Sequence, residues 1–143
     1  MLEYFFTPRT VAIIGASHTP GKIGYAILEN FVRGDFKGKV YPVNPDITPI
    51  FNLTVYPSIK KIPDEVDLAV IAVKAEIVPK ILKECVEKKV KTVIIISAGF
   101  SEIGEAGKKL EEKCKKIIER KKVHVIGPNV IGVYDSSSAV DTL

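Results

Sequence analysis

The stretch that decides the fold is Val11-Ala-Ile-Ile-Gly-Ala-Ser-His-Thr-Pro-Gly-Lys-Ile-Gly24. An apolar run stops at Gly15, the chain passes through small and turn-forming residues, and apolar residues return with a helical period between Ile23 and Leu28. This order is typical of a buried strand, a loop and the start of a helix. Because free amides at a helix start bind phosphate groups, the stretch predicts a phosphate-binding loop, with Ser17 and Lys22 as further donors.

Strand patterns and helical patterns alternate along the rest of the chain. We expect strands at residues 11–16, 38–45, 67–73, 91–97 and 123–126. We expect helices at residues 22–33 and 75–88, and a long third helix capped by Ser101. Glu102 and Glu105 fall in the first turns of this third helix, where negative charge suits the helix dipole. The pattern predicts an α/β fold, namely a Rossmann-like open, mainly parallel sheet with helices on both faces, in a single domain over residues 1–143.

Two parts of the chain are less regular. Between residues 47 and 58, Pro49 and Pro57 bracket a short candidate strand at 53–56, and residues 60–63 fit a helical turn. The tail from Ile131 onward shows no strong pattern. We therefore predict only minor elements in the first part and assign no element in the second.

The expected strands all end in small, polar or glycine-rich residues. Right-handed crossovers bring the carboxyl ends of parallel strands to one edge of a sheet, and ligands bind at that edge where the strand order reverses. The sequences that follow the strands are Gly15-Ala-Ser, Asn44-Pro, Val73-Lys, Ser97-Ala-Gly-Phe and Gly127-Pro-Asn. We expect these residues to surround one ligand.

The spacing of the glycines distinguishes this loop from the usual dinucleotide fingerprint. Gly15 and Gly21 are six residues apart, so the loop is wider than the pyrophosphate turn of many NAD enzymes. NAD binders also place a carboxylate at the end of the second strand, where this chain has the neutral Asn44. Asp46 follows shortly after and would serve NAD if the strand register were shifted, so an NAD(P)-binding domain stays an open alternative.

Composition excludes several classes of protein. The net charge of +4 comes mostly from lysines spread along the chain, without the clustered arginines and aromatics of a nucleic-acid interface. No apolar run is long enough to span a membrane. Cys85 and Cys114 fall on apolar helical stripes, which predicts that they fill the core, and no metal-binding spacing is present. We expect a cytoplasmic protein that contacts neither nucleic acid nor membrane.

Several short motifs, in order, carry a family resemblance. They are Ile14-Gly-Ala-Ser with Gly21-Lys-Ile-Gly-Tyr25, Gly38-Lys-Val-Tyr-Pro-Val-Asn44, Val66-Asp-Leu-Ala-Val-Ile71, Ile96-Ser-Ala-Gly-Phe100 and Ile126-Gly-Pro-Asn129. The chain resembles the N-terminal CoA-binding domain of ADP-forming acyl-CoA (acetyl-CoA) synthetases, which are relatives of the succinyl-CoA synthetase alpha subunit. The resemblance covers nearly the whole chain and implies that the ligand is coenzyme A.

The resemblance also implies where parts of CoA lie. The residues near the CoA phosphates would be Gly15, Ala16, Ser17, Lys22 and Gly24. The residues on the adenosine side would be Val43, Asn44 and Pro45, with Val73 and Lys74 close by. The path of the pantetheine arm would be bordered by Ser97, Ala98, Gly99 and Phe100, and by Gly127, Pro128 and Asn129.

Two departures from the family pattern bear on the site. A basic residue often follows the second-strand turn in the family, whereas Asp46 follows it here, so Lys39 is only an unassigned candidate for the ribose phosphate. Val130 stands where the family often has a cysteine or small polar residue after Gly-Pro-Asn. A catalytic role for that position is therefore not expected.

The resemblance bears on catalysis as well. Such synthetases pass phosphate through a histidine in a second domain and bind nucleotide in an ATP-grasp unit. Here the two histidines, His18 and His124, do not match that histidine, and no catalytic residue is predicted. The chain would act as an acid–thiol ligase only with phosphohistidine and ATP-grasp partners. A third hypothesis is an interaction subunit that kept the fold and lost the ligand.

Overall fold

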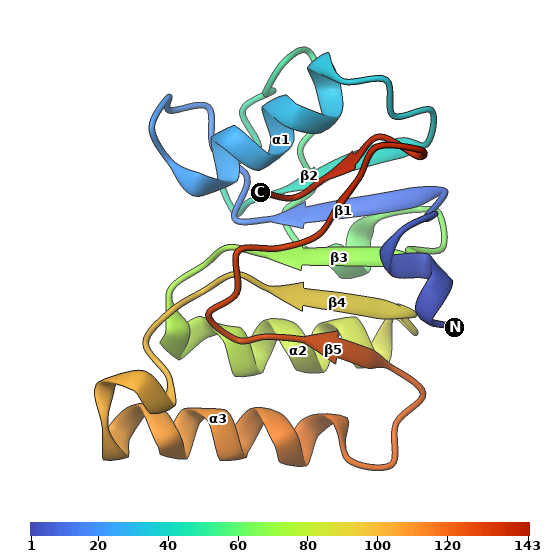
Figure 1. The fold of residues 1–143 in the computed structure, drawn as a ribbon. Coiled ribbons are helices and arrows are strands. Elements are labelled where there is room, and N and C mark those ends of the chain that lie inside the picture. Colours follow the sequence, from blue (N-terminus) through green and yellow to red (C-terminus); the bar gives the residue numbers. More distant parts are fainter.

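A parallel sheet of five strands forms the centre of the protein, and the computed structural model describes all residues from 1 to 143 (Figure 1). The strands lie in the order β2-β1-β3-β4-β5. Their bounds are β1 Thr10–Ile14, β2 Lys39–Val43, β3 Leu68–Ile71, β4 Thr92–Ile95 and β5 His124–Ile126. The predicted α/β class and parallel sheet are confirmed.

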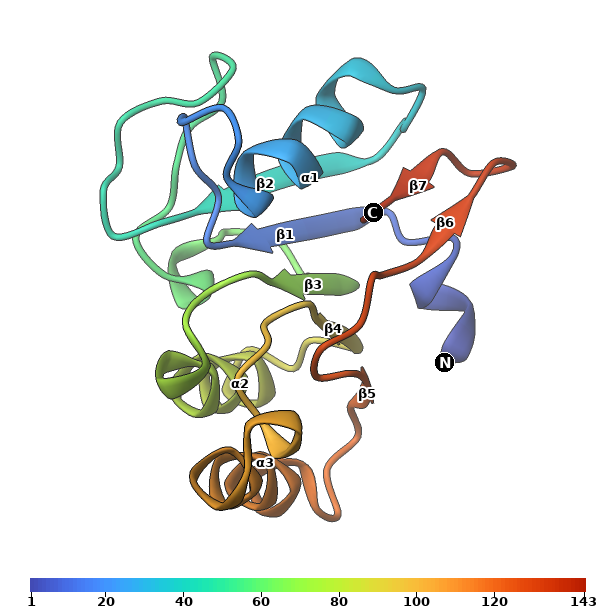
Figure 2. The ribbon, with the colours of Figure 1, turned by 60° about the vertical axis from the view of Figure 1, so that its left-hand side comes forward.

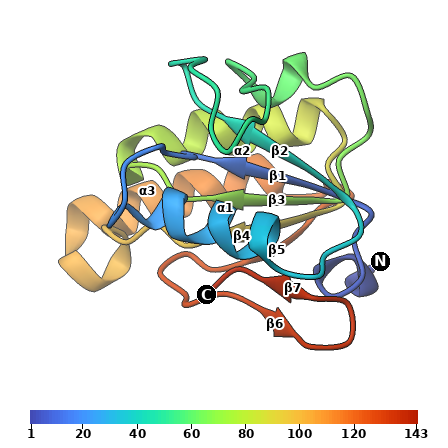
Figure 3. The ribbon, with the colours of Figure 1, turned by 90° about the horizontal axis from the view of Figure 1, so that it is seen from above.

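Helices cover both faces of the sheet, as predicted (Figure 3). Helix α1 (Ile23–Arg33) lies on one face, and α2 (Val78–Glu87) and α3 (Glu105–Ile118) lie on the other. Alternate residues of β1 enter the two cores: Val11 and Ile13 pack with α1, while Ala12 and Ile14 pack with α2 and α3. The strands are therefore apolar on both faces because each face is covered.

The C-terminal tail is ordered by tertiary contacts that the sequence pattern did not indicate. It forms a small antiparallel hairpin of β6 (Tyr134–Asp135) and β7 (Val140–Asp141), on the same side of the sheet as α1 (Figure 3). Val133 and Val140 enter the core beneath α1. The sequence pattern assigns no element after Ile131, because two-residue strands are too short to show a period.

The candidate strand at residues 53–56 is also absent. Only isolated bridges form there, between Val43 and Tyr56 and between Ile50 and Leu53. Phe51 and Asn52 both have positive φ, at 48° and 61°, and turn the chain back on itself. Tyr56 nevertheless extends the sheet locally, since its N–H donates to the Pro42 carbonyl at 3.0 Å. The expected helical turn nearby is the 3-10 helix η2 (Ile59–Lys61).

The third helix begins later than predicted. Ser101 starts a separate 3-10 turn, η4 (Ser101–Ile103), and α3 follows behind Gly104, which has φ 114°. No side chain caps α3, so the prediction that Ser101 caps it was wrong. A positive φ at Gly104 breaks the helical path between the two segments. The second helix likewise starts with a 3-10 turn, η3 (Ala75–Ile77), before α2.

Both cysteines are free and buried, as predicted. Cys85 lies in α2 and Cys114 in α3, within the core between these helices and the sheet. Burial raises the pKa of each thiol, because a thiolate is poorly solvated there. We infer a packing role for both. None of the helices is long and apolar enough to cross a bilayer.

Candidate ligand site at the carboxyl edge of the sheet

Five loops meet at the carboxyl edge of the sheet, where the strand order reverses (Figure 2). Strand β1 pairs with β2 on one side and with β3 on the other. The connection after β1 enters α1 on one face, and the connection after β3 enters α2 on the opposite face. Connections that leave to opposite faces open a crevice at the ends of β1 and β3, where α/β proteins bind ligands.

Two glycines of the first loop are required by close backbone contacts. A Cβ on Gly15 would lie 2.2 Å from the Ala72 carbonyl oxygen, and a Cβ on Gly24 would lie 1.8 Å from the Gly15 carbonyl oxygen. The start of α1 thus packs directly on the end of β1, which in turn touches the loop after β3. Gly21 has φ 89° and nothing near its Cβ position, so it serves the turn alone.

Asn44 ties the second loop to the first. Its side-chain amide donates to the Ala16 carbonyl at 2.8 Å, and its side-chain oxygen accepts the N–H of Asp46 at 2.8 Å. The N–H of Gly15 donates in turn to the Val43 carbonyl at 3.0 Å. The loops after β1 and β2 are therefore held together before any ligand arrives.

Ser97 joins the remaining three loops. Its hydroxyl accepts the N–H of Val73 at 3.2 Å, and its carbonyl accepts the N–H of Asn129 at 3.0 Å. Gly127 has φ 104°, and a Cβ there would lie 2.4 Å from the Ile95 carbonyl oxygen. The loops after β3, β4 and β5 are thus packed and bonded side by side, which makes this edge a preformed surface.

We expect Ser97→Ala to lower the free energy of unfolding by about 1–2 kcal/mol, because the nearly buried N–H of Val73 loses its acceptor. Urea denaturation measures the loss. Ser136→Ala is the control, since Ser136 is exposed and its hydroxyl makes no hydrogen bond. Equal stability of the two variants would contradict the role of Ser97 as a tie between loops.

Two lysines at this edge are free to meet an anion. Lys22 immediately precedes α1 and Lys74 immediately precedes η3; both are exposed, and neither forms an ion pair. Ser17 accepts the N–H of Thr19 at 3.0 Å, which shapes the loop before the helix. His18 is exposed beside Thr19. Unpaired ammonium groups beside a helix N-terminus favour phosphate.

The residues predicted to bind ligand lie at the carboxyl ends of strands, in the loops that follow them or, for Gly24, in the first turn of α1. The set comprises Gly15, Ala16, Ser17, Lys22, Gly24, Val43, Asn44, Pro45, Val73, Lys74, Ser97, Ala98, Gly99, Phe100, Gly127, Pro128 and Asn129. The fold therefore brings them to one edge, and their individual contacts with a ligand stay predictions. His124, expected to be structural, is exposed at the start of the edge strand β5.

Sequence reasoning missed Glu102 as part of this loop system. We expected it to serve the dipole of the third helix, yet its carboxylate accepts the N–H groups of Gly99 and Phe100. These bonds, with the Gly99 N–H first, lower the pKa of Glu102. The sequence signal for this contact was the spacing: Glu102 follows Phe100 by two residues, which allows its carboxylate to accept the Phe100 N–H.

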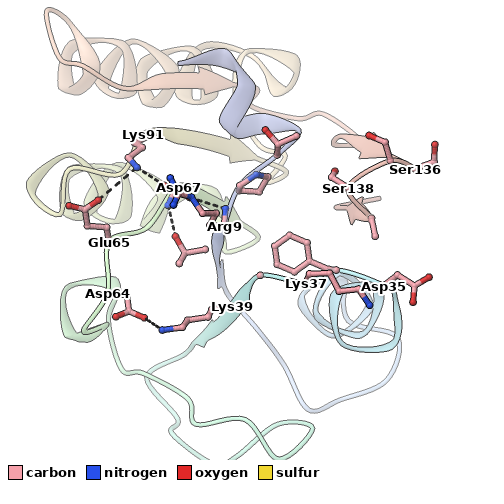
Figure 4. A pocket seen from close by; sticks show the side chains of 17 residues that line it. Arg9, Asp35, Lys37, Lys39, Asp64, Glu65, Asp67, Lys91, Ser136 and Ser138 are labelled. Carbon is pink, nitrogen blue, oxygen red and sulfur yellow. Dashed lines mark hydrogen bonds and ion pairs between the residues drawn. The ribbon is translucent and has the colours of Figure 1, made fainter.

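A pocket of about 940 Å³ lies at the opposite, amino-terminal edge of the sheet (Figure 4). Its charged groups are mostly paired with each other, as Lys39 with Asp64 at 2.7 Å and Lys91 with Asp67 at 2.6 Å. Lys39 begins β2 and so lies far along the strand from the predicted phosphate loop. Its candidacy for the ribose phosphate was wrong, because β2 carries it to the other edge.

The fold and its glycine-rich switch point define the class: a nucleotide-binding α/β domain with strand order 2-1-3-4-5. Comparison with protein families narrows this class. A model described as CoA binding domain matches residues 9–136, which is most of the chain. The chain belongs to this family of CoA-binding domains.

Relatives of established function agree with the family assignment. The chain is 45% identical over 141 residues to acetate–CoA ligase [ADP-forming] II of Archaeoglobus fulgidus, covering 99% of this chain and 21% of that protein. It is 48% identical over 136 residues to the acetate–CoA ligase [ADP-forming] I subunit alpha of Pyrococcus furiosus, covering 92% and 29%. The chain thus spans between a fifth and a third of the length of these relatives.

Solved structures share the fold closely. A protein from Pyrococcus horikoshii matches with a TM-score of 0.93 at 43% identity, covering 99% of this chain and 32% of that one. An acetyl-coenzyme A synthetase of Ca. Korarchaeum cryptofilum, in complex with phosphate and ADP, matches with a TM-score of 0.90 at 38% identity, covering 97% and 30%. These likenesses confirm the fold over nearly the whole chain.

Proposed function

We propose that this chain is the CoA-binding domain of an ADP-forming acyl-CoA synthetase and holds CoA across the carboxyl edge of its sheet. The observation that carries the proposal is the family match over residues 9–136, on a fold whose switch point holds a glycine-rich loop. Two unpaired lysines at that edge supply charge for an anionic cofactor. The domain binds and orients the cofactor.

The phosphates of CoA are placed beside the loop from Gly15 to Gly24. Helix α1 is 11 residues long, and its free N–H groups and positive dipole end face this loop. Ser17 and Lys22 are its side-chain donors, and Lys74 lies on the neighbouring loop. Glycine at positions 15 and 24 lets the start of α1 pack directly on the end of β1, which fixes the helix start beside this loop.

The end of β2 distinguishes CoA from NAD. An NAD site needs a free carboxylate there to bond the ribose hydroxyls. The residue at this strand end is the neutral Asn44, whose side chain donates to the Ala16 carbonyl. Asp46 lies three residues beyond the strand, and its Oδ1 accepts the N–H and hydroxyl of Thr48, at 3.1 and 2.7 Å, which lowers the pKa of Asp46. Because the neutral strand end and the family match both favour CoA, the proposal sets aside the NAD(P) alternative.

Catalysis is assigned to other domains. His18 and His124 are both exposed, and neither has a polar partner positioned to activate it for phosphoryl transfer. Since these relatives are about three to five times as long as this chain, a phosphohistidine domain and an ATP-grasp domain are proposed as its partners. We place the chain in the cytoplasm, which suits its two free cysteines.

Calorimetric titration with CoA, acetyl-CoA, NAD and NADP tests the cofactor, and we expect binding of the two CoA species alone. Lys22→Ala should weaken CoA binding by about 1–3 kcal/mol, as expected for a lost contact to phosphate. Lys80→Ala is the matched control, because Lys80 is an exposed, unpaired lysine in α2.

Other outcomes would redirect the proposal. Binding of NAD without CoA would establish the dinucleotide alternative. No detectable binding of any of the four ligands would favour an interaction subunit that has lost its cofactor. Equal CoA affinity in Lys22→Ala and Lys80→Ala would move the phosphates away from the glycine loop.

A further inference from the structure

Two backbone carbonyls in the loop after β4 have no partner in the protein. They belong to Ala98 and Gly99, and neither accepts a hydrogen bond from the backbone or from a side chain. The residues on both sides are anchored: Ser97 bonds to Val73 and Asn129, and Phe100 is fully buried. Between these anchors, the directions of the Ala98 and Gly99 carbonyls are not fixed by other hydrogen bonds.

The carboxylate of Glu102 determines the orientation of these two peptide groups. Its Oε1 accepts the N–H of Gly99 and the N–H of Phe100, the latter at 3.0 Å. In a trans peptide group the N–H and the preceding C=O point in opposite directions. Glu102 therefore turns the carbonyls of Ala98 and Gly99 away from itself. Gly99 has φ 104°, a conformation that would readily flip in a glycine without such a hold.

The Glu102 side chain is not needed to keep the loop on the protein. Phe100 is inserted in the core, and α3 packs so closely on it that a Cβ at Gly107 would lie 1.8 Å from the Phe100 carbonyl oxygen. Glu111 of α3 also accepts the N–H of Ser101 at 3.3 Å. What Glu102 adds to these anchors is the orientation of two peptide groups at the ligand edge.

We propose that Glu102 is a positioning residue that aims the Ala98 and Gly99 carbonyls at amide N–H donors of the bound ligand. This inference rests on the proposed function: the pantetheine arm of CoA contains two secondary amides, and each carries an N–H that needs an acceptor once water is displaced. Two backbone carbonyls that already point toward the predicted path of that arm can accept these N–H groups without a reorganisation of the loop on binding.

The test compares two ligands in calorimetric titrations of the whole chain. CoA carries the pantetheine amides, whereas adenosine 3′,5′-bisphosphate keeps the adenosine and two of the three phosphates of CoA and lacks these amides. Glu102→Ala should weaken CoA binding roughly tenfold, as two oriented hydrogen bonds are lost, and leave bisphosphate binding unchanged. Glu102→Gln should retain part of the affinity, since its amide oxygen still accepts an N–H. Glu105→Ala, an exposed neighbour without a side-chain bond, should bind both ligands normally.

Each other outcome has a definite meaning. Unchanged CoA affinity in Glu102→Ala, with normal binding by the wild type, overturns the inference and leaves the proposed function intact. Equal weakening for both ligands means that Glu102 only stabilises the loop, which also overturns it. If the wild type does not bind CoA, both the proposed function and this inference are contradicted. Thermal unfolding of each variant verifies that the ligands meet a folded domain.

Discussion

Gly24→Ala is expected to lower the free energy of unfolding by about 3 kcal/mol and to abolish CoA binding. The added methyl would lie 1.8 Å from the Gly15 carbonyl oxygen, so α1 must move away from the end of β1. In an ordinary helix the same change stabilises by about 0.5–1 kcal/mol, because alanine is the better helix former. The sign of the change measured by urea denaturation therefore tests the contact.

Gly21→Ala provides the control for the first loop. No atom lies within 4 Å of a Cβ at that position, and the only obstacle is the positive φ of 89°. The expected loss is about 1–2 kcal/mol, the usual strain of a left-handed residue. A Gly24→Ala variant as stable as the wild type would mean that α1 does not pack on Gly15 as the structure shows.

Asp67→Ala is expected to lower the free energy of unfolding by about 3 kcal/mol near neutral pH. The Asp67 carboxylate is almost fully buried and accepts from the Lys91 ammonium at 2.6 Å and from the Arg9 N–H at 2.8 Å. Its removal leaves the partly buried Lys91 ammonium with only the exposed Glu65 carboxylate, at 3.8 Å, and leaves the Arg9 N–H without its acceptor. Asp35→Ala, at the same edge but exposed and unpaired, should cost less than 0.5 kcal/mol.

The stability difference between the wild type and Asp67→Ala is expected to depend on pH. Burial raises the pKa of Asp67, but the Lys91 ammonium and the Arg9 and Thr10 hydrogen bonds lower it by more, so the net shift is downward. A lowered pKa stabilises the fold at pH values above the unfolded pKa of about 3.9, and this stabilisation is lost as pH falls through the folded pKa. The stability gap between wild type and Asp67→Ala should thus be constant from pH 7 to 5 and shrink below 4. A gap that does not change down to pH 2 would contradict an ionised Asp67.

The sequence predicted the fold where side-chain patterns are local. The runs Val11–Ile14 and Leu68–Ile71 are apolar at every position, which indicates strands covered on both faces. The sequence pattern assigned no element to the tail and mispredicted the start of the third helix, both for tertiary reasons. Val133 and Val140 become ordered only by packing beneath α1, and Ser101 is separated from α3 by the positive φ of Gly104.

The site divides in the same way. Glycine-rich and polar residues after each strand predicted a common ligand edge, since the handedness of crossovers brings these ends together. The hydrogen bonds that join the loops were not predictable: Asn44 to Ala16 spans 28 residues, and Val73 to Ser97 spans 24. Lys39 was misplaced although the predicted strand 38–45 already put it at the amino end of β2, away from the ligand edge.

The sequence by itself determined the alternation of strands and helices, the edge at which the ligand residues gather and the family to which they point. These features follow from local periodicity and from the chirality of the chain. Tertiary structure alone decided that Gly24 meets Gly15, that Asn44 bonds Ala16, and that Glu102 orients the loop after β4. Such contacts depend on how separate elements come within a few ångströms of each other, and no local pattern encodes that distance.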